Sequence, residues 1–302
     1  MCGIVGFWDK SNDESESLGR TILKMLEALD RRGPDSAGVA LYGSPENGDL
    51  VLKIKLGDHG PFEGKCQQVT ERVETLGTVR EAVVTGPYLR VVLAYPDDPS
   101  QLDGLIEAID DEIEVVSLGR QLEIAKQVGS PRNLEDSYGI SGITGSHGIG
   151  HTRLSTESKI DLSHSQPFWA HGCPDLAIVH NGHITNYHKM RCRYEQQDIH
   201  FYTENDSEII AIYLGLQLRK GKTLRQAMEA SIQDLDGSFC YLAATSDALG
   251  FAKDQFAFKP LLFTETDSFV AVATEEIALR FAFTGSYQVR EAQAGDVQIW
   301  QR

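Results

Sequence analysis

The sequence lacks any apolar run long enough to cross a membrane, and no basic residues precede the apolar stretch at its start. We therefore predict a cytoplasmic protein without a membrane span or signal peptide. The five cysteines are scattered and form no Cys-x-x-Cys pair, which argues against a disulfide framework, a zinc knuckle or an iron–sulfur cluster. Basic residues are scarce, 28 against 44 acidic ones, and the net charge of −16 argues against binding to nucleic acid.

The apolar pattern predicts helices and antiparallel strands in separate runs, which favours an α+β fold over a doubly wound parallel sheet. Helices are predicted at residues 17–30, 102–109, 206–220 and 275–282, and another begins near Thr223. Strands are predicted at residues 3–8, 39–43, 89–95, 113–119, 176–180 and 295–300, and four more between 238 and 274 are predicted to form one meander. The motifs that could carry chemistry flank residues 50–140, so we interpret 50–140 as an inserted α/β subdomain within a single domain over 1–302.

Cys2 directly follows the initiator methionine and precedes a short apolar strand. If Met1 is trimmed, Cys2 carries a thiol and a free α-amine, whose ordinary pKa is about 7.7–8.0. One residue would then supply both a nucleophile and a base. The structural alternative is that Cys2 is only a small buried apolar residue, and position alone favours it.

Three polar segments further along the chain each admit a structural and a functional interpretation. Arg153 is either a surface arginine or a planar fork that binds a carboxylate. Asn181-Gly182 is either a hairpin turn or a pair of donors for an oxyanion hole. Asp206 either caps a helix or holds an ammonium group.

Two pairs of histidines, His147 with His151 and His180 with His183, invite a metal interpretation. Neither pair has a carboxylate in an HExxH-like frame, and glycines between the first two disfavour a helix, so we predict no metal site. The glycine-rich segment 142–150 has no Walker lysine and does not match GxGxxG, so we interpret it as a loop.

Together and in this order, the segments resemble the class II glutamine amidotransferases, members of the N-terminal-nucleophile hydrolases. The resemblance covers residues 2–43 and 148–300 and rests on MCGIVG, RGPDSAG, GHTRLST, HNG and ENDSE, followed by KDQFAFKPLLF and ATEEIAL. The segment HSQPF departs from the family pattern, because Gln166 stands where histidine is usual.

The resemblance implies a four-layer αββα sandwich and hydrolysis of L-glutamine to glutamate and ammonia. It implies that Cys2 is the nucleophile, that its own α-amine is the base, and that Asn181 and Gly182 form the oxyanion hole.

The resemblance also implies a set of substrate-binding residues. Arg153 would bind the α-carboxylate of glutamine and Asp206 its α-amine, with Thr156 and Arg32 as further candidates. Two charged anchors at one end of glutamine would fix the scissile amide at the other end against the thiol.

The chain ends where a glutaminase domain of this family would end. It therefore resembles most the stand-alone subunits of glutamate synthase or N-methylglutamate synthase type. That resemblance implies a hetero-oligomer in which a separate synthase subunit consumes the ammonia. It also implies that the flavin and the iron–sulfur cluster belong to that subunit, with no cofactor in this chain.

Two other interpretations stay open. One is an N-terminal-nucleophile amidase that acts on another acyl amide, as penicillin acylase does, although such an enzyme would not need anchors for an amino-acid head group. The other is a non-catalytic regulatory subunit that keeps the fold, which a retained Met1 would favour.

Overall fold

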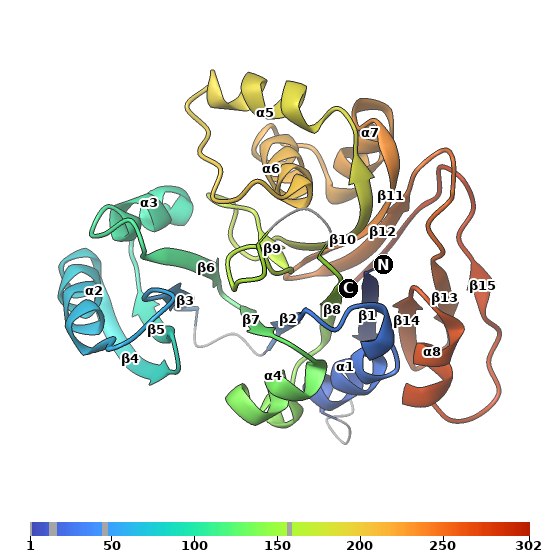
Figure 1. Ribbon diagram of the computed structural model, residues 1–302, viewed down its shortest axis with the longest axis horizontal. Coiled ribbons are helices and arrows are strands. Elements are labelled where there is room, and N and C mark those ends of the chain that lie inside the picture. Colours follow the sequence, from blue (N-terminus) through green and yellow to red (C-terminus); the bar gives the residue numbers. More distant parts are fainter. Residues whose placement is uncertain (1, 12–16, 44–47, 156–158) are drawn as a thin grey trace.

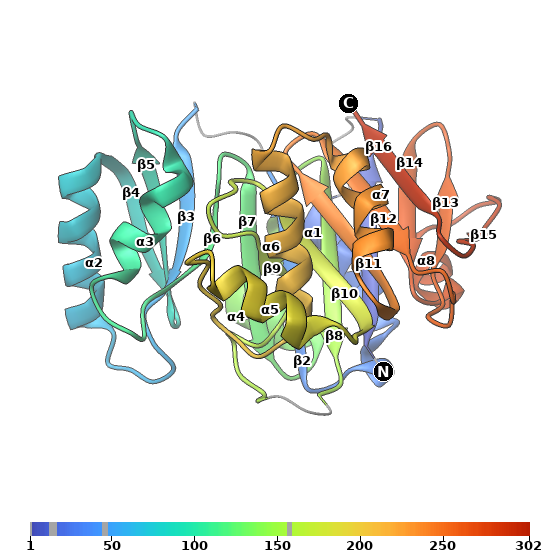
Figure 2. The ribbon, with the colours of Figure 1, turned by 90° about the horizontal axis from the view of Figure 1, so that it is seen from above.

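The computed structural model describes residues 2–11, 17–43, 48–155 and 159–302. Two β-sheets pack face to face (Figures 1 and 2). The seven-stranded sheet consists, in spatial order, of β15 (Arg290–Glu291), β13 (Leu262–Glu265), β14 (Phe269–Ala273), β1 (Gly3–Asp9), β8 (His147–Arg153), β2 (Ser36–Tyr42) and β7 (Leu122–Val128). The five-stranded sheet consists of β16 (Val297–Gln301), β12 (Ala248–Lys253), β11 (Gly237–Thr245), β10 (Ala177–Ile184) and β9 (Phe168–Trp169).

Helices cover the outer face of each sheet. The seven-stranded sheet carries α1 (Leu18–Glu27), α4 (Pro131–Tyr138) and α8 (Glu276–Ala282). The five-stranded sheet carries α6 (Asp206–Arg219) and α7 (Leu224–Asp234), with α5 (Tyr187–Glu195) packed against α6. Helix, sheet, sheet and helix therefore form four layers, which Figure 1 shows from top to bottom, and the predicted αββα sandwich is confirmed.

The apolar run after Cys2 becomes the central strand β1, which pairs antiparallel with β14 and β8. Ile4 and Trp8 pack between the two sheets, while Val5 and Phe7 pack under the helices. Because both faces of the sheet are covered, the strand is apolar on both sides. Side chains alternate along a strand, so Cys2 lies on the same side as Ile4 and points toward the layer between the sheets.

A separate four-stranded sheet occupies residues 50–119. Its strands, in spatial order, are β4 (Thr78–Thr85), β5 (Tyr88–Ala94), β3 (Leu50–Lys55) and β6 (Glu114–Gly119). α2 (Glu63–Leu76) and α3 (Leu102–Glu107) pack against it. The segment predicted as a subdomain over 50–140 thus divides near Gly119, because β7 pairs with β2 in the main sheet and α4 packs on α1.

Polar contacts join this inserted unit to the sandwich. Asp103 and His171 lie 3.2 Å apart, from Oδ2 to Nδ1. The Tyr202 hydroxyl donates to Glu107 at 2.6 Å, and its ring stacks on that of His171.

Two predictions of local structure are corrected. The strands between 238 and 274 do not form one meander, because β11 and β12 join one sheet whereas β13 and β14 join the other. The predicted loop at 142–150 is half strand, since β8 starts at His147. Gly148 and Gly150 belong to that strand, and a Cβ at Gly150 would meet α1 side chains at about 3.0 Å, so close packing explains the glycine-rich sequence. Within the described residues, no helix has the length and apolarity to span a membrane.

Candidate active site

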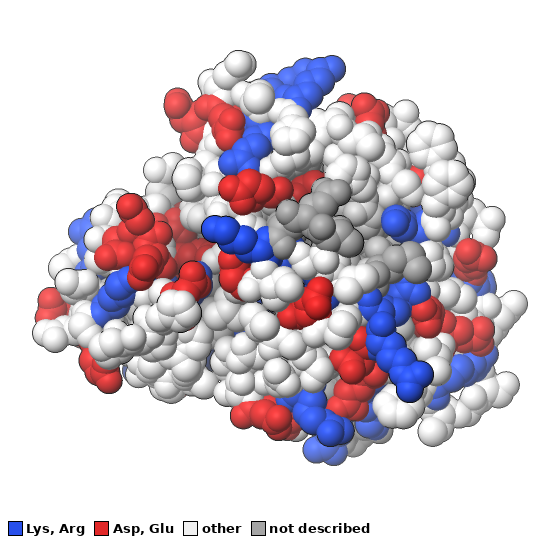
Figure 3. Space-filling model, in the orientation of Figure 1, with Lys and Arg blue, Asp and Glu red and all other residues white. Residues whose placement is uncertain are grey.

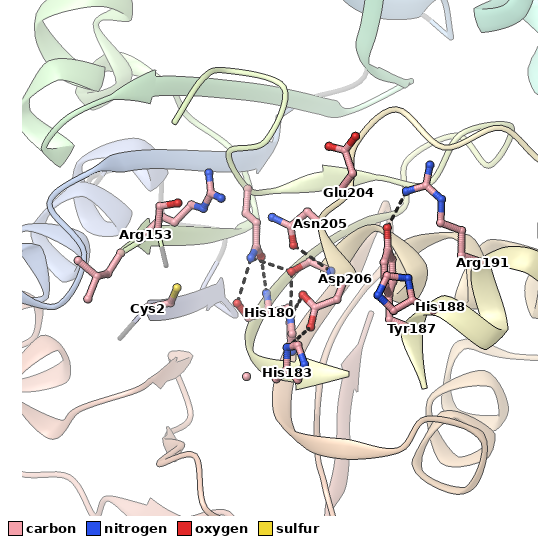
Figure 4. Close-up of a pocket in the computed structure, with 15 residues that line it drawn as sticks. Cys2, Arg153, His180, His183, Tyr187, His188, Arg191, Glu204, Asn205 and Asp206 are labelled. Atoms are coloured by element: carbon pink, nitrogen blue, oxygen red, sulfur yellow. Dashed lines mark hydrogen bonds and ion pairs between the residues drawn. The ribbon is translucent and has the colours of Figure 1, made fainter. Parts of the chain in front are cut away.

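A pocket of about 470 Å³ lies where the start of β1 meets β8, β10 and the start of α6. It brings together Cys2, Arg153, Gly182 and Asp206, which are far apart in the sequence (Figure 4). The other lining residues are Leu154, Ser155, Gln166, His180, His183, Tyr187, His188, Arg191, Glu204, Asn205 and Ser207. The volume falls within the range of about 300–1,000 Å³ that is usual for small-molecule sites.

The Cys2 thiol needs a base to become a nucleophile. Burial raises the pKa of Cys2 above its ordinary value, and the Leu154 N–H and the charge of Arg153 only partly oppose this rise. The thiol is therefore protonated at neutral pH. Arg32 donates from Nε to the main-chain oxygen of Cys2 at 3.2 Å and pairs with Glu275. Arg32, predicted to bind substrate, thus contacts the main chain of Cys2 and does not line the pocket.

Asn181 points into the same layer as Cys2. Ala177 and Val179 of β10 pack between the two sheets, whereas Ile178 packs under the helices, so alternation directs Asn181 inward. Asn181 is 3% exposed, and its Nδ2 has no hydrogen-bond partner in the described structure. A buried amide donor without a partner is rare in folded proteins and is explained when a ligand accepts from it.

Gly182 lies within β10, so the hairpin turn at Asn181-Gly182 that the sequence allowed is not formed. The strand pairs with β11 through Gly182 and on to Ile184. Gly182 has φ +148°, and a Cβ there would lie 2.3 Å from the oxygen of Ser238, so only glycine fits. The N–H groups of His180 and Ile184 bond to side chains on the edge away from β11, and alternation places the Gly182 N–H on that edge, beside the pocket.

Asp206 is the first residue of α6, but it does not cap the helix. Asn205 is the cap, and its side chain accepts the N–H of Ser207 at 3.0 Å. The Asp206 carboxylate accepts the N–H of Ile184 at 2.7 Å and lies 3.4 Å from Nδ1 of His183. It is thereby fixed beside the pocket with capacity to accept another donor.

Arg153 ends β8 and is 4% exposed. Its Nη1 donates to the oxygen of Lys159 at 2.8 Å, and burial lowers its pKa while Cys2, Asp161 and Asp35 act in the opposite direction. Figure 4 shows Arg153 and Asp206 on different sides of the pocket that contains Cys2. Thr156, another predicted binding residue, lies outside the described residues.

The charge pattern of the surrounding surface is mixed. Acidic and basic side chains are interspersed on the face shown in Figure 3, and acidic ones gather over the inserted unit beside α3 and β6. Asp111 and Glu112 are exposed in the turn between α3 and β6. The described side chains of this face offer no continuous basic patch to a phosphate backbone.

The two pairs of histidines do not form a metal centre. His147 stacks between Trp8 and Tyr42, and its Nε2 lies 2.7 Å from the oxygen of Thr245. Burial lowers the pKa of His147 to about 4 and that of His151 to about 3, so both rings are neutral core residues. In the second pair, His180 is buried whereas His183 is exposed.

Several residues of the pocket wall were not predicted from the sequence. Gln166 and Ser207 are buried residues of this wall and hydrogen-bond to His180 and to each other. Tyr187 and Arg191 of α5 also line the pocket, and Arg191 Nη1 donates to the Tyr187 hydroxyl. In the sequence, only Gln166 could have been singled out, because it departs from the family pattern. Ser207 could not, because a serine near the start of a helix is common.

Comparisons with known proteins agree with this architecture. The sequence profile of a family described as glutamine amidotransferase domain matches residues 151–280. A "Putative glutamine amidotransferase" from Methanothermobacter thermautotrophicus is 38% identical over 307 residues and covers 100% of both chains. The "Glutamine amidotransferase-like protein GlxB" of Rhizobium meliloti is 33% identical over 307 residues, covering 99% of this chain and 98% of that protein.

Solved structures share the fold. Glutamine phosphoribosylpyrophosphate amidotransferase from B. subtilis matches 99% of this chain with a TM-score of 0.64 at 20% sequence identity. The present chain spans 47% of that protein.

The four-layer sandwich with a pocket at the start of its central strand is the architecture of the N-terminal-nucleophile hydrolases. The chain itself belongs to the class II glutamine amidotransferases, as its ordered motifs predicted, and is an enzyme of that class. Its closeness to subunits of glutamate synthase type stays a prediction.

Proposed function

We propose that this chain is a glutaminase subunit that hydrolyses L-glutamine to glutamate and ammonia through a thioester on Cys2. The observation that carries the proposal is that one pocket holds a thiol, the guanidinium of Arg153 and the carboxylate of Asp206. The two charges match the α-carboxylate and the α-ammonium of a free amino acid. An unsatisfied amide donor, Asn181 Nδ2, lies in the same layer as the thiol.

The chemistry follows from these positions. After removal of Met1, the α-amine of Cys2 accepts the thiol proton, and the thiolate attacks the carboxamide carbon of glutamine. Asn181 Nδ2 and the Gly182 N–H donate to the oxyanion that forms. The protonated amine gives its proton to the leaving group, which departs as ammonia and leaves a γ-glutamyl thioester. Water, deprotonated by the same amine, then hydrolyses the thioester and releases glutamate.

Asp206→Asn and Arg153→Lys test the anchors. Each variant is expected to raise the KM for L-glutamine, by about 10- to 100-fold for Asp206→Asn and about tenfold for Arg153→Lys, with a smaller change in kcat. The head group is unchanged in the reaction, so its contacts stabilise the bound substrate and the transition state equally. Asparagine can still accept the N–H of Ile184, so the start of α6 keeps its place. Steady-state release of glutamate measures both constants.

Asp267→Asn is the matched control, because Asp267 is exposed in the turn between β13 and β14, outside the pocket. It should leave KM unchanged. Equal hydrolysis of glutamine and of an amide that lacks the α-carboxylate and α-ammonium would instead favour the general amidase. A protein that retains Met1 and hydrolyses neither would favour the regulatory subunit.

We further propose that the ammonia passes to a separate synthase subunit of glutamate synthase or N-methylglutamate synthase type, in a cytoplasmic hetero-oligomer. The flavin and the iron–sulfur cluster would belong to that partner. A stacked and exposed pair of aromatic residues, Phe256 and Phe258, supports a contact with another protein. Both lie in the loop after β12, which Asp254 holds by accepting the N–H of Phe256 at 2.7 Å.

The isolated chain is therefore expected to hydrolyse glutamine slowly and to be activated when the synthase subunit binds, because free ammonia would otherwise be lost. Glutamate release is measured for the chain alone and after addition of the flavin-containing subunit encoded with it. Full activity of the lone chain, unaltered by that subunit, would contradict coupling and leave an independent glutaminase.

A further inference from the structure

β10 loses its strand partner on one edge just before the oxyanion residues. β11 accompanies β10 along its whole length, but β9 pairs only with Ala177 and Ile178. Beyond Ile178 no strand of the described residues covers the second edge. An edge without a partner is free to twist and shift, which conflicts with the fixed donor geometry that an oxyanion hole requires.

The side chain of Gln166 takes the place of the missing strand at His180. Its Oε1 accepts the His180 N–H at 2.6 Å, and its Nε2 donates to the His180 carbonyl oxygen at 3.2 Å. A carboxamide offers the same donor and acceptor as a peptide group of a neighbouring strand. Gln166 is 4% exposed and His180 is 2% exposed, so water hardly competes for these bonds.

The same carboxamide also reaches the start of α6. Gln166 Nε2 donates to Oγ of Ser207 at 3.0 Å, and that hydroxyl bonds to Nδ1 of His180 at 2.8 Å. Ser207 directly follows Asp206, whose carboxylate bonds to β10 as well. The main chain of Gln166 is itself held against β2, since a Cβ at Gly38 would lie 2.1 Å from its oxygen. Gln166 is thus a fixed bridge between two sheets and a helix.

We propose that Gln166 is a positioning residue for glutamine hydrolysis, which holds β10 at His180 and thereby sets the places of Asn181 Nδ2 and the Gly182 N–H. The inference rests on the oxyanion role proposed above for these two donors. A small displacement of the donors weakens their bonds to the developing oxyanion more than it weakens substrate binding. We call the two hydrogen bonds from the Gln166 carboxamide to the His180 main chain the clamp. Because the head group of glutamine is bound by other residues, loss of the clamp lowers kcat and leaves KM nearly unchanged.

Gln166→Glu tests the clamp at almost constant shape. A carboxylate still accepts the His180 N–H, but its second oxygen faces the His180 carbonyl and can no longer donate to it. We expect kcat to fall about tenfold at neutral pH, with KM within about twofold of wild type. In acid the carboxyl gains a proton and regains a donor, so the ratio of variant to wild-type kcat should rise toward about pH 5. Gln166→Leu, which makes neither bond, should lose about 100-fold at every pH.

The ratio of variant to wild-type kcat cancels the pH effects of other groups around the clamp, because both proteins contain those groups. Cys2, Arg153, His180 and Asp206 line the same pocket and are common to both proteins. Gln127→Glu is the matched control, because Gln127 also accepts a main-chain N–H, at 2.9 Å, and donates to a serine hydroxyl at 2.9 Å, on β7 outside the pocket. It should leave kcat and its pH dependence unchanged.

Hydrogen exchange of the peptide from His180 to Ile184 measures the clamp without activity. Exchange should be faster in Gln166→Leu than in wild type, with an unchanged thermal midpoint showing that the fold persists. Should Gln166→Leu unfold, Ser207→Ala is expected to lower kcat about threefold, because it removes the hydroxyl bonds to Gln166 and His180 but keeps both bonds of Gln166 to the His180 main chain.

Three outcomes would overturn the proposal: wild-type kcat in both Gln166 variants, a loss confined to KM, or unaltered exchange in the 180–184 peptide. If the wild-type chain itself hydrolysed no glutamine, the proposed function would fail, and the exchange experiment would still decide whether Gln166 holds β10.

Discussion

The Cys2→Ala variant is expected to release no measurable glutamate from L-glutamine, a loss of at least about 10⁴-fold in kcat. Among the described residues, Cys2 is the only cysteine that lines the pocket. Cys240 cannot replace it, because burial raises its pKa to about 12 and it lies inside the core. Alanine is similar in size and keeps the main-chain oxygen that Arg32 binds, so the thermal midpoint should stay within about 2 °C of wild type.

Covalent labelling checks the same assignment from the other direction. A glutamine analogue with an electrophilic ketone should add one adduct to Cys2 in wild type and none in Cys2→Ala. Cys192→Ala is the matched control, because Cys192 is exposed and should affect neither labelling nor hydrolysis. Adducts at Cys66, Cys173, Cys192 or Cys240 would contradict the assignment. Intact mass reports whether Met1 is removed, and protein that retains Met1 should be as inactive as Cys2→Ala because its α-amine is not free.

The fold could be predicted from the sequence, and so could Cys2, Arg153 and Asp206 of the pocket, because each of these residues lies at the end of a regular element. Cys2 precedes a strand that is apolar on both faces, and Arg153 ends another strand beside it. Asp206 starts a helix whose apolar positions are plain in the sequence. The family resemblance supplied the order of these segments, and the structure brings Cys2, Arg153, Gly182 and Asp206 together in one pocket.

The backbone conformation of Asn181-Gly182 could not be predicted from the dipeptide alone. Asn-Gly is the strongest short hairpin signal, yet β10 continues through it. The pairing with β11 and the close approach of the Ser238 oxygen to Gly182 decide the conformation, and both come from residues more than fifty positions away. Tertiary contacts therefore overrode a local turn preference, at the place where the proposed mechanism needs a donor.

In the inserted segment, the sequence pattern does not reveal several of the elements. Its helix α2 has buried residues only at Val69 and Val73, so its apolar face is too narrow to stand out in the sequence. The exposed strand β4 likewise shows no alternation. The boundary near Gly119 depends on β7 pairing with β2, a long-range choice that composition does not encode. Gln166 is similar, because its function follows from where β9 ends rather than from the residue itself.

Asn181→Ala is expected to lower kcat by about 10²-fold or more, while the KM for L-glutamine changes little. Nδ2 of Asn181 is buried and has no partner in the described structure, so in the proposed mechanism its bond forms with the oxyanion. An unpaired buried donor costs about 1–3 kcal/mol of stability in the free protein. Removing it should therefore leave the free energy of unfolding unchanged or higher, so activity and stability are expected to move in opposite directions.

Asn186→Ala is the control that distinguishes the expected loss of kcat in Asn181→Ala from a loss caused by a less stable fold. Asn186 Nδ2 donates to the oxygen of Asp234 at 2.9 Å, and its Oδ1 accepts the N–H of Asp236 at 3.1 Å, outside the pocket. Its removal should lower the thermal midpoint and leave kcat unchanged. If Asn181→Ala instead raised KM at constant kcat, Asn181 would be a head-group contact. If it lost stability and activity together, as a structural asparagine would, the oxyanion assignment would be wrong and Gly182 would remain the only donor of the pair.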